Sequence, residues 1–349
     1  MRILIYGDAG PATGGWCYAE TLREIGHEVS QFPDPDSSGL YRSLPSRFYR
    51  KMFKRMPELH RRQHISFLNN EVKRFQPSII IVQKGLHLSY DDVMSLRQGG
   101  RWICNVNHDD FFSANQNNWS PTQRHAIPAY NYIFTTRSVN VEEVFPFNPN
   151  VEFFPFAYYP RIHRVLEIPP GERNKWDADV VFVGTYEKPR AALLEQLALN
   201  RSLRLVVHGA QWSKLSRSSP LLKYVCSSDL RFDELCKAVR GARISLGFLR
   251  KENRDDYTQR TFEIPACGGL LLAERTNRHL SYFKEGLEAE FFNPDSADEL
   301  CEKIFLLLND PERRERIRLA GYEAVLRGQH TYKDRLQRLL QVYNQTKMT

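Results

Sequence analysis

The sequence predicts an α/β fold of two domains, each built around a parallel β-sheet. Two series of short apolar runs alternate with helix-length amphipathic stretches, as expected where helices connect neighbouring parallel strands. A proline-rich connection separates the two series, and a chain of 349 residues has the length of two ordinary domains. With 42% hydrophobic and only 26% charged residues, the chain can bury two cores.

The first series predicts an N-terminal Rossmann-like domain over residues 1–165. Its apolar runs are too short for helices and have the length of buried strands. We expect strands at residues 3–6, 28–32, 78–82, 102–106 and 132–135, with helices at 16–25 and 64–75 between them.

The second series predicts a C-terminal Rossmann-like domain over residues 172–330. We expect strands at residues 180–183, 205–208, 244–246 and 270–273, with helices at 190–199, 232–240 and 297–308. Pro155, Pro160, Pro169, Pro170 and Gly171 form the connection, which we interpret as an interdomain hinge. Residues 331–349 are expected to form a helix that packs back toward the first domain.

One segment carries a carboxylate close to a glycine pair. Residues 260–269 read Arg-Thr-Phe-Glu-Ile-Pro-Ala-Cys-Gly-Gly, which places Glu263 a short helical turn before an apolar strand. Asp255 lies eight residues upstream. This pattern resembles the acidic Glu-x7-Glu signature of glycosyltransferases with the GT-B fold, with the shorter Asp in the first position.

The resemblance extends over residues 178–340. Residues 179–184, the Lys-Pro-Arg at 188–190, residues 291–300 and a helical run at 310–340 look like the C-terminal half of the group 1 glycosyltransferases. Arg-Thr-Phe-Glu-Ile before Cys-Gly-Gly is similar to the spore-maturation CgeB-like subgroup. The resemblance implies two Rossmann-like domains facing across a cleft, with the nucleotide-sugar donor on the second domain and the acceptor on the first.

The same resemblance assigns donor-binding residues. Glu263 would hold the ribose hydroxyls, and Asp255 or Asp256 would face the donor sugar. A diphosphate needs nearby cations because negative charge grows on the leaving nucleotide. The expected donor-binding residues are Glu263, Arg260, Arg190, Lys188, Gly184, Thr261 and Phe262. Taken alone, each cation is also compatible with an ordinary solvated surface charge, and Glu263 with an acid in the first turn of a helix.

A glycine-rich loop follows the first expected strand and precedes a helix. Thr13, Gly14 and Gly15 are placed so that backbone amides and the helix dipole could face an anionic or hydroxyl-rich ligand. The spacing is not Gly-x-Gly-x-x-Gly, which disfavours dinucleotide binding. The alternative is a tight turn that only requires small residues. In the glycosyltransferases that the chain resembles, this loop lies near the transferred sugar.

The fourth expected strand ends at Asn107 and is followed by His108, Asp109 and Asp110. Open parallel sheets bind their ligands at this end of the strands. The segment resembles the strand-terminal His-Asp pair of the group 1 enzymes, whose His contacts the donor sugar. We therefore expect His108, Asp109 and Asp255 to be the catalytic residues. The alternatives are a structural His108 and an N-cap role for one of the two aspartates.

The net charge of +8 is concentrated in one segment. Residues 42–62 hold eight Lys or Arg and one Glu, with apolar residues at helical spacing. Such a basic amphipathic helix suits an anionic membrane surface. It could instead pack its apolar stripe on the first domain, and no nucleic-acid-binding motif accompanies it.

Neither metal nor cofactor is expected. Asp34-Pro-Asp36 has the Asp-x-Asp spacing of metal-dependent transferases but reads more simply as a turn. The six scattered cysteines show no zinc or disulfide pattern, and residues 2–7 read as a strand rather than a secretory leader. A cytoplasmic protein, peripheral to the inner face of the plasma membrane, fits this composition.

The sequence therefore predicts a metal-independent, retaining glycosyltransferase of the hexosyltransferase type. It would move a sugar from a nucleoside diphosphate to a glycan, lipid-linked or protein acceptor. Two alternatives remain open: a nucleotide-sugar 2-epimerase of the same architecture, and a non-catalytic protein that binds membranes or polyanions.

Overall fold

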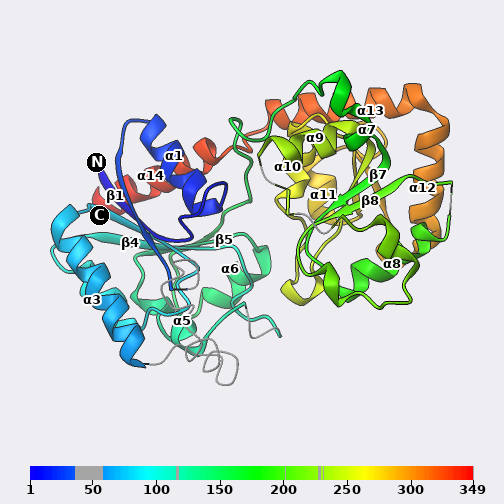
Figure 1. Ribbon diagram of the computed structural model, residues 1–349. Coiled ribbons are helices and arrows are strands. Elements are labelled where there is room, and N and C mark those ends of the chain that lie inside the picture. Colours follow the sequence, from blue (N-terminus) through cyan, green and yellow to red (C-terminus); the bar gives the residue numbers. More distant parts are fainter. Residues whose placement is uncertain (36–57, 115–117, 201, 227–228, 231, 349) are drawn as a thin grey trace. The chain divides into compact units, whose positions relative to one another are not determined.

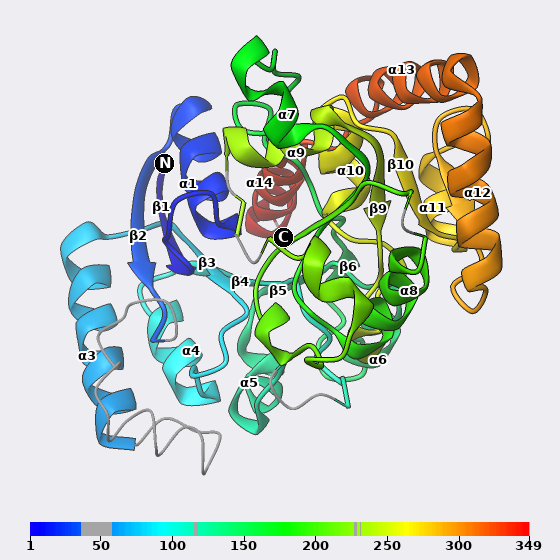
Figure 2. The ribbon, with the colours of Figure 1, turned by 45° about the vertical axis from the view of Figure 1, so that its right-hand side comes forward.

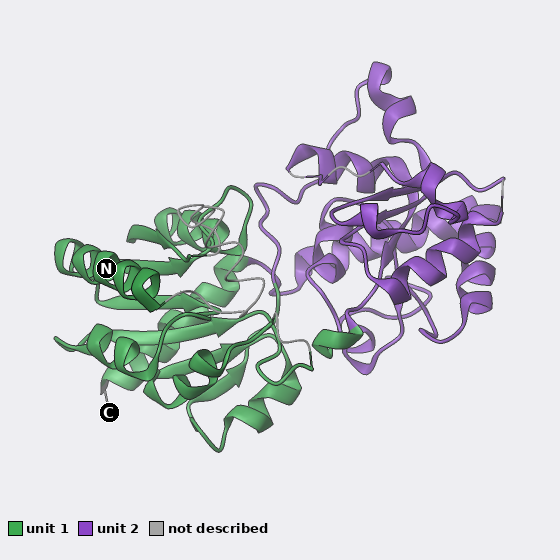
Figure 3. Ribbon diagram, turned by 60° about the horizontal axis from the view of Figure 1, so that its bottom comes forward, with its two compact units in different colours: residues 1–156, 251–254, 332–349 green, residues 157–250, 255–331 purple. Residues whose placement is uncertain are grey.

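The computed structural model describes residues 1–35, 58–114, 118–200, 202–226, 229–230 and 232–348 (Figure 1). It confirms the expected fold class, because the chain forms two α/β units, each with a wholly parallel sheet. Unit 1 comprises Met1–Phe156, Lys251–Arg254 and Tyr332–Thr349, and unit 2 comprises Ala157–Arg250 and Asp255–Thr331 (Figure 3).

The sheet of unit 1 has six strands in the order β2-β1-β3-β4-β5-β6 (Figure 2). The strands are β1 (Arg2–Gly7), β2 (Glu28–Pro33), β3 (Ile79–Gln83), β4 (Trp102–Asn107), β5 (Tyr132–Thr135) and β6 (Val151–Phe153). After β2 the chain returns past β1 to form β3, so the order of the strands reverses between β1 and β3. Sheets of this kind bind ligands at the carboxyl ends of the two strands that flank such a reversal.

Helices cover both faces of this sheet. They are α1 (Gly14–Glu24), α3 (Glu58–Phe75), α4 (Tyr90–Arg97), α5 (Pro121–His125), α6 (Ser138–Val144) and α14 (Tyr332–Met348), with short 3-10 turns at Ile127–Ala129 and Lys251–Asn253. Helices α1 and α14 lie side by side on one face, and α3 and α5 lie on the other (Figure 1).

Strand alternation explains this arrangement. Leu4 and Tyr6 of β1 and Ile80 and Val82 of β3 share one buried cluster with apolar residues of α3, α4 and α6. Side chains at the intervening positions point to the opposite face, where Trp102 of β4 meets Tyr343 of α14 with ring centroids 5.6 Å apart. Helix α14, at the end of the chain, therefore completes the core of unit 1.

The sheet of unit 2 has five strands in the order β11-β10-β9-β7-β8. The strands are β7 (Ala178–Val183), β8 (Leu205–His208), β9 (Ala242–Gly247), β10 (Leu271–Glu274) and β11 (Glu290–Phe292). The strand order reverses between β7 and β9, which places the expected ligand site of this unit at the carboxyl ends of these two strands.

The helices of unit 2 are α7 (Arg173–Trp176), α8 (Lys188–Ala198), α9 (Asp233–Gly241), α10 (Arg260–Ala266), α11 (Asn277–Tyr282), α12 (Ala297–Asn309) and α13 (Pro311–Arg327). Short 3-10 turns lie at Pro170–Glu172, Trp212–Lys214 and Pro220–Tyr224. Alternate residues of the sheet, such as Val180 and Phe182 of β7, pack with buried residues of α8 and α12 into the core.

The structure adds details that the apolar pattern did not predict. Strands β6 and β11 have three residues each and lie at sheet edges. The expected helical run over residues 310–340 is two helices, because α13 ends at Arg327 and α14 begins at Tyr332. Among the described helices, none is long and apolar enough to cross a membrane.

Candidate functional site

In unit 1, a polar pocket of about 330 Å³ lies at the carboxyl ends of β1 and β3. We call it the unit 1 pocket, and it is lined by Asp8, Gly14, Gly15, Asp34, Gln83, Lys84, Leu86 and His108. It coincides with the reversal of strand order, so topology and surface shape indicate the same ligand site.

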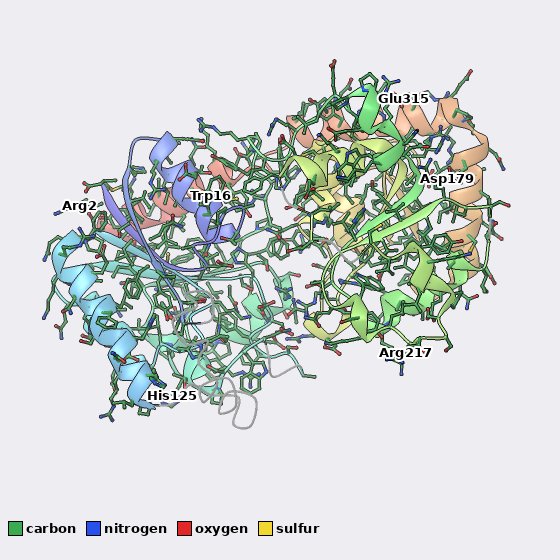
Figure 4. All side chains as sticks on the ribbon, viewed as in Figure 1. Arg2, Trp16, His125, Asp179, Arg217 and Glu315 are labelled. Carbon is green, nitrogen blue, oxygen red and sulfur yellow. The ribbon has the colours of Figure 1, made fainter. Side chains whose placement is uncertain are left out.

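The glycine loop forms one wall of this pocket. The side chain of Thr13 caps α1 by accepting a hydrogen bond from the backbone N–H of Trp16, a residue labelled in Figure 4. A Cβ atom on Gly15 would lie 2.0 Å from the carbonyl oxygen of Asp8, so only glycine fits there. A Cβ atom on Gly14 would meet nothing closer than 3.8 Å. Gly15 is thus required for packing, whereas Gly14 faces free space in the pocket.

His108 is half-buried and lines the same pocket. Its ring packs edge-on against Tyr18, with centroids 6.2 Å apart, and parallel to Phe156, with centroids 5.9 Å apart. Burial lowers the pKa of His108 to about 4. The imidazole is therefore neutral near pH 7.

Asp109 and Lys84 form an ion pair beside the pocket. Lys84 Nζ lies 2.5 Å from Asp109 Oδ2, and the amide of Asn253 donates to Asp109 Oδ1 over 3.4 Å. Lys84 has a left-handed backbone with φ of 59°, which is rare for a residue other than glycine, Asn or Asp. Such local strain is found most often at functional sites.

Asp110 has a structural position, unlike Asp109. It is fully buried, and its carboxylate accepts hydrogen bonds from Arg254 at 2.6 and 2.7 Å and from Asn140 at 2.8 Å. The expected N-cap role of Asp109 or Asp110 is wrong, because the next helix, α5, is capped by Ser120. Asp110 instead fixes residues Lys251–Arg254 within unit 1.

In unit 2, Arg190 lies at the ends of β7 and β9. Its guanidinium is buried and donates to the carbonyl oxygens of Thr185, Phe248 and Leu249, each over 3.3 Å. Three of its five N–H groups are therefore used by the backbone. Arg190 holds the two strand ends together, and its guanidinium also lies 3.7 Å from a carboxylate oxygen of Glu187.

Lys188 and Gly184 differ in their surroundings. Lys188 is the exposed first residue of α8. A Cβ atom on Gly184 would lie 2.6 Å from the buried ring of Phe182, so glycine leaves room for that ring.

Glu263 of unit 2 is a buried carboxylate, only 6% exposed. One of its oxygens pairs with Arg260, which also donates to the carbonyl of Val183 at the end of β7. The other oxygen lies 3.3 Å from His163 Nε2. Burial would raise the pKa of Glu263, but Arg260 and His163 outweigh it and lower the pKa, so the carboxylate stays charged.

His163 presents its N–H to Glu263. The backbone N–H of Tyr159 donates to His163 Nδ1 over 3.0 Å, so the proton of the neutral ring is on Nε2. Burial lowers the pKa of His163, which keeps the ring neutral. Glu263 is thereby oriented from two sides and retains lone pairs for a ligand hydroxyl.

Two further expected donor-binding residues have buried side chains. Thr261 Oγ1 lies 2.9 Å from His279 Nε2. Phe262 is completely buried and stacks on His330 with ring centroids 4.3 Å apart. The side chain of Phe262 lies in the core of unit 2, so it can only support the residues around it.

Asp255 is half-buried and lies where the chain re-enters unit 2. Burial lowers the pKa of Arg190, and the nearby charge of Asp255 offsets part of this lowering. The neighbouring Asp256 pairs with Arg278 over 3.4 Å. Asp255 is therefore the better placed of the two beside the end of the sheet.

Sequence reasoning missed three residues at these sites, Gln83, Lys84 and His163. Gln83 is only 6% exposed, and its side-chain Nε2 has no hydrogen-bond partner in the described part of the chain. Gln83 and Lys84 directly follow an expected strand, in the position that singled out His108. His163 had no comparable signal, because it lies in the connection between the two series.

Other expectations fall largely outside the described residues. Of the basic segment 42–62, only residues 58–62 are described, as the start of α3, and there Arg61 and Arg62 pair with Glu58. Asp36 is likewise not described, while Asp34 lines the unit 1 pocket. Within the described ranges, no three His, Cys, Asp or Glu side chains are grouped so that they could hold a metal ion.

Comparison with known proteins matches this architecture. Residues 190–341 match the model of a family described as glycosyl transferase-like. Among curated proteins, no sequence matches the chain.

Solved structures match over the whole chain. Sucrose-phosphate synthase from Thermosynechococcus elongatus has a TM-score of 0.69 at 13% identity, covering 100% of this chain and 99% of that one. HepE of Anabaena, in complex with UDP and glucose, has a TM-score of 0.67 at 11% identity and 99% and 100% coverage. A putative UDP-N-acetylglucosamine 2-epimerase from Listeria monocytogenes has a TM-score of 0.58 at 10% identity and 100% and 97% coverage.

At these identities the solved structures show the fold alone. The two parallel-sheet domains are those of the GT-B glycosyltransferases. The family match over residues 190–341 adds support for a glycosyltransferase.

Proposed function

We propose that this protein transfers a sugar from a nucleoside diphosphate to a glycan, lipid-linked or protein acceptor. Unit 2 would bind the donor and unit 1 the acceptor. The observation that carries this proposal is the buried Glu263, which Arg260 and His163 keep charged and oriented within the stretch that matches a glycosyl transferase-like family.

The donor site uses a carboxylate for hydroxyls and cations for phosphates. A charged carboxylate accepts hydrogen bonds from the two ribose hydroxyls more strongly than a neutral group would. Lys188 is exposed, and Arg190 is fixed at the ends of β7 and β9 by three backbone carbonyls. These residues and Arg260 would stabilise the charge that grows on the leaving diphosphate, so we propose transfer without a metal.

We further propose that transfer retains the anomeric configuration. A retaining reaction depends on stabilising the leaving phosphate more than on a strong enzyme base. The neutral His108 would position the sugar by hydrogen bonding, with the Lys84–Asp109 pair beside it. The CgeB-like subgroup and a hexose as the transferred sugar belong to the same proposal.

A nucleotide-sugar 2-epimerase is the second candidate. It is favoured by the structural similarity to the putative epimerase from Listeria monocytogenes, although its TM-score of 0.58 is below those of the other two structures reported above. An epimerase would return an isomer of the nucleotide sugar, whereas a transferase releases the nucleotide.

We also propose that residues 42–62 bring the protein to the inner face of the plasma membrane in the cytoplasm. Their positive charge and apolar spacing support this proposal. Co-sedimentation with anionic liposomes at low salt tests it, and its failure would leave the transferase proposal intact.

A ligand screen tests the donor assignment. The solved HepE complexes contain UDP and UDP-glucose, so uridine nucleotides are the first probes. We expect UDP, GDP, dTDP or CMP to raise the melting temperature, with and without EDTA. If none of these nucleotides stabilises the protein, the donor assignment is wrong.

A further inference from the structure

A second cavity of unit 1 has an aromatic lining and a volume of about 740 Å³. We call it the aromatic pocket, and its walls include Tyr90, Phe112, Trp119, Arg124, Ile127 and Phe147. It lies around α5, whose last residue, His125, is labelled in Figure 4. A volume between about 300 and 1,000 Å³ is typical of pockets that bind small molecules.

Arg124 is a half-buried cation in the lining of this pocket. Its guanidinium carbon lies 3.1 Å from the ring centroid of Trp119 and 5.0 Å from that of Phe112. Its Nε donates to the carbonyl of Phe111 over 2.6 Å, which fixes the plane of the group. In the described part of the chain, its two terminal amino groups have no hydrogen-bond partner.

The nearby carboxylates are already paired. Asp110 and Glu143 are the acids that act on the charge of Arg124. Both are held by Arg254, through contacts of 2.6 to 2.8 Å. Arg124 forms no ion pair of its own among the described residues, so its fixed amino groups can receive an anionic group.

The lining argues against a bare sugar as the occupant. A sugar carries a hydroxyl on nearly every carbon, and each hydroxyl that is buried without a partner costs free energy. The walls of the aromatic pocket offer few polar groups besides Arg124 and His125. An apolar chain next to one anionic group matches this lining better.

Hydrogen bonds join the α5 region, which lines the aromatic pocket, to the loop after β3, which lines the unit 1 pocket. Ser120 and Gln123 of the α5 region donate to the carbonyls of Leu86 and Lys84 over 2.5 and 2.7 Å. Lys84 and Leu86 line the unit 1 pocket. The two pockets therefore share the loop after β3 as a common support.

We propose that the aromatic pocket binds the apolar chain of a lipid-linked acceptor and that Arg124 pairs with its phosphate. The acceptor group itself would lie in the unit 1 pocket. This inference rests on the proposed transferase function, which leaves the acceptor class open, and it selects the lipid-linked class.

Titration calorimetry with decyl phosphate, below the concentration at which it forms micelles, tests this inference. We expect decyl phosphate to bind one site per chain, decanol to bind more weakly, and inorganic phosphate not to bind. Arg124→Gln should raise the dissociation constant about tenfold or more, because hydrogen bonds to charged groups are strong. Phe147→Ser should raise it roughly fivefold by removing apolar contact.

Phe145→Ser is the matched control. Phe145 and Phe147 are similarly exposed, at 59% and 54%, but only Phe147 lines the pocket. Equal weakening by both serine variants, an unchanged affinity in Arg124→Gln, or no binding of decyl phosphate would each overturn the inference. A change in oligomeric state with Phe147→Ser would show a protein contact instead.

Nucleotide binding is measured in the same preparations. A protein that binds nucleotide sugars but not decyl phosphate would lose this inference alone. A protein that binds decyl phosphate and no nucleotide sugar would keep the lipid site and lose the transferase proposal.

Discussion

At the scale of single residues, Glu263 is the most constrained carboxylate of the proposed donor site. Both of its oxygens are oriented within unit 2, by Arg260 and by His163. We expect Glu263→Gln to weaken nucleotide-sugar binding at least tenfold, because a neutral amide replaces a charged acceptor. Calorimetric titration with the best nucleotide from the screen measures this loss.

Glu315→Gln is the control for this experiment. Glu315 also pairs with an arginine three residues away on a helix of unit 2, but its side chain is 55% exposed, against 8% for Glu263. Normal affinity in a folded Glu263→Gln protein, or equal losses in both variants, would remove Glu263 from the donor site.

Asp109 and Asp110 are adjacent but should respond differently to substitution. Asp110→Ala leaves Arg254 without its buried partner and should cost roughly 2 to 3 kcal/mol of unfolding free energy. Asp109 pairs with Lys84 at a partly exposed position, so Asp109→Ala should cost less than about 1 kcal/mol. Urea unfolding of both variants checks this order, and the reverse order would contradict the structural role of Asp110.

The same comparison shows what sequence alone can assign at the residue scale. The sequence pattern placed His108, Asp109 and Asp110 at the end of a strand, but it did not show which of the two aspartates is buried. Arg254 lies 144 positions from Asp110, and no local pattern links such distant partners. His163 was missed for the same reason, since its contact with Glu263 depends on the folded chain.

At the scale of elements, the two glycines at the start of α1 have different roles: Gly15 is required for packing, whereas Gly14 faces the unit 1 pocket. Gly15→Ala should destabilise unit 1, because its Cβ atom would lie 2.0 Å from a backbone oxygen. Gly14→Ala should leave the melting temperature nearly unchanged and lower turnover, because its methyl group would enter the unit 1 pocket. Thermal unfolding and nucleotide release are measured for both.

Gly171→Ala is the control for these substitutions, since a Cβ atom there has no neighbour within 4 Å. If Gly14→Ala retains full turnover, the unit 1 pocket does not take part in the reaction.

Strong apolar runs predicted the central strands of both sheets, because a strand buried on both faces must be apolar throughout. The edge strands β6 and β11 were not predicted, since three residues are too few to show a pattern. The resemblance suggested one helical run over residues 310–340, whereas the expected helix at residues 331–349 agrees with the start of α14 at Tyr332. This start coincides with the return of the chain to unit 1 at Tyr332, a tertiary feature.

At the scale of the whole molecule, buried histidines should make stability depend on pH. Burial lowers the pKa of His64, His108 and His279 to about 4, from 6.5. Between these values the unfolded chain binds protons that the folded protein does not, so the unfolding free energy falls as pH falls from 6.5 toward 4. Each histidine contributes roughly 1 to 3 kcal/mol to this loss.

His64→Phe tests this prediction, because the ring of His64 already packs edge-on against the rings of Tyr6 and Phe32. We expect the variant to lose less stability than the unmodified protein between pH 7.5 and pH 5 in urea unfolding. Identical losses in the two proteins would show that His64 is not neutral in the folded state.

The central claim is that the whole molecule transfers sugar from a nucleotide donor. The most direct test is incubation with UDP-glucose and related nucleotide sugars, with separation of the nucleotide products by liquid chromatography. We predict that at least one donor releases its nucleoside diphosphate, slowly to water and faster with an acceptor, and that Glu263→Gln suppresses this release. An isomerised nucleotide sugar, or no release from any donor, would contradict the claim.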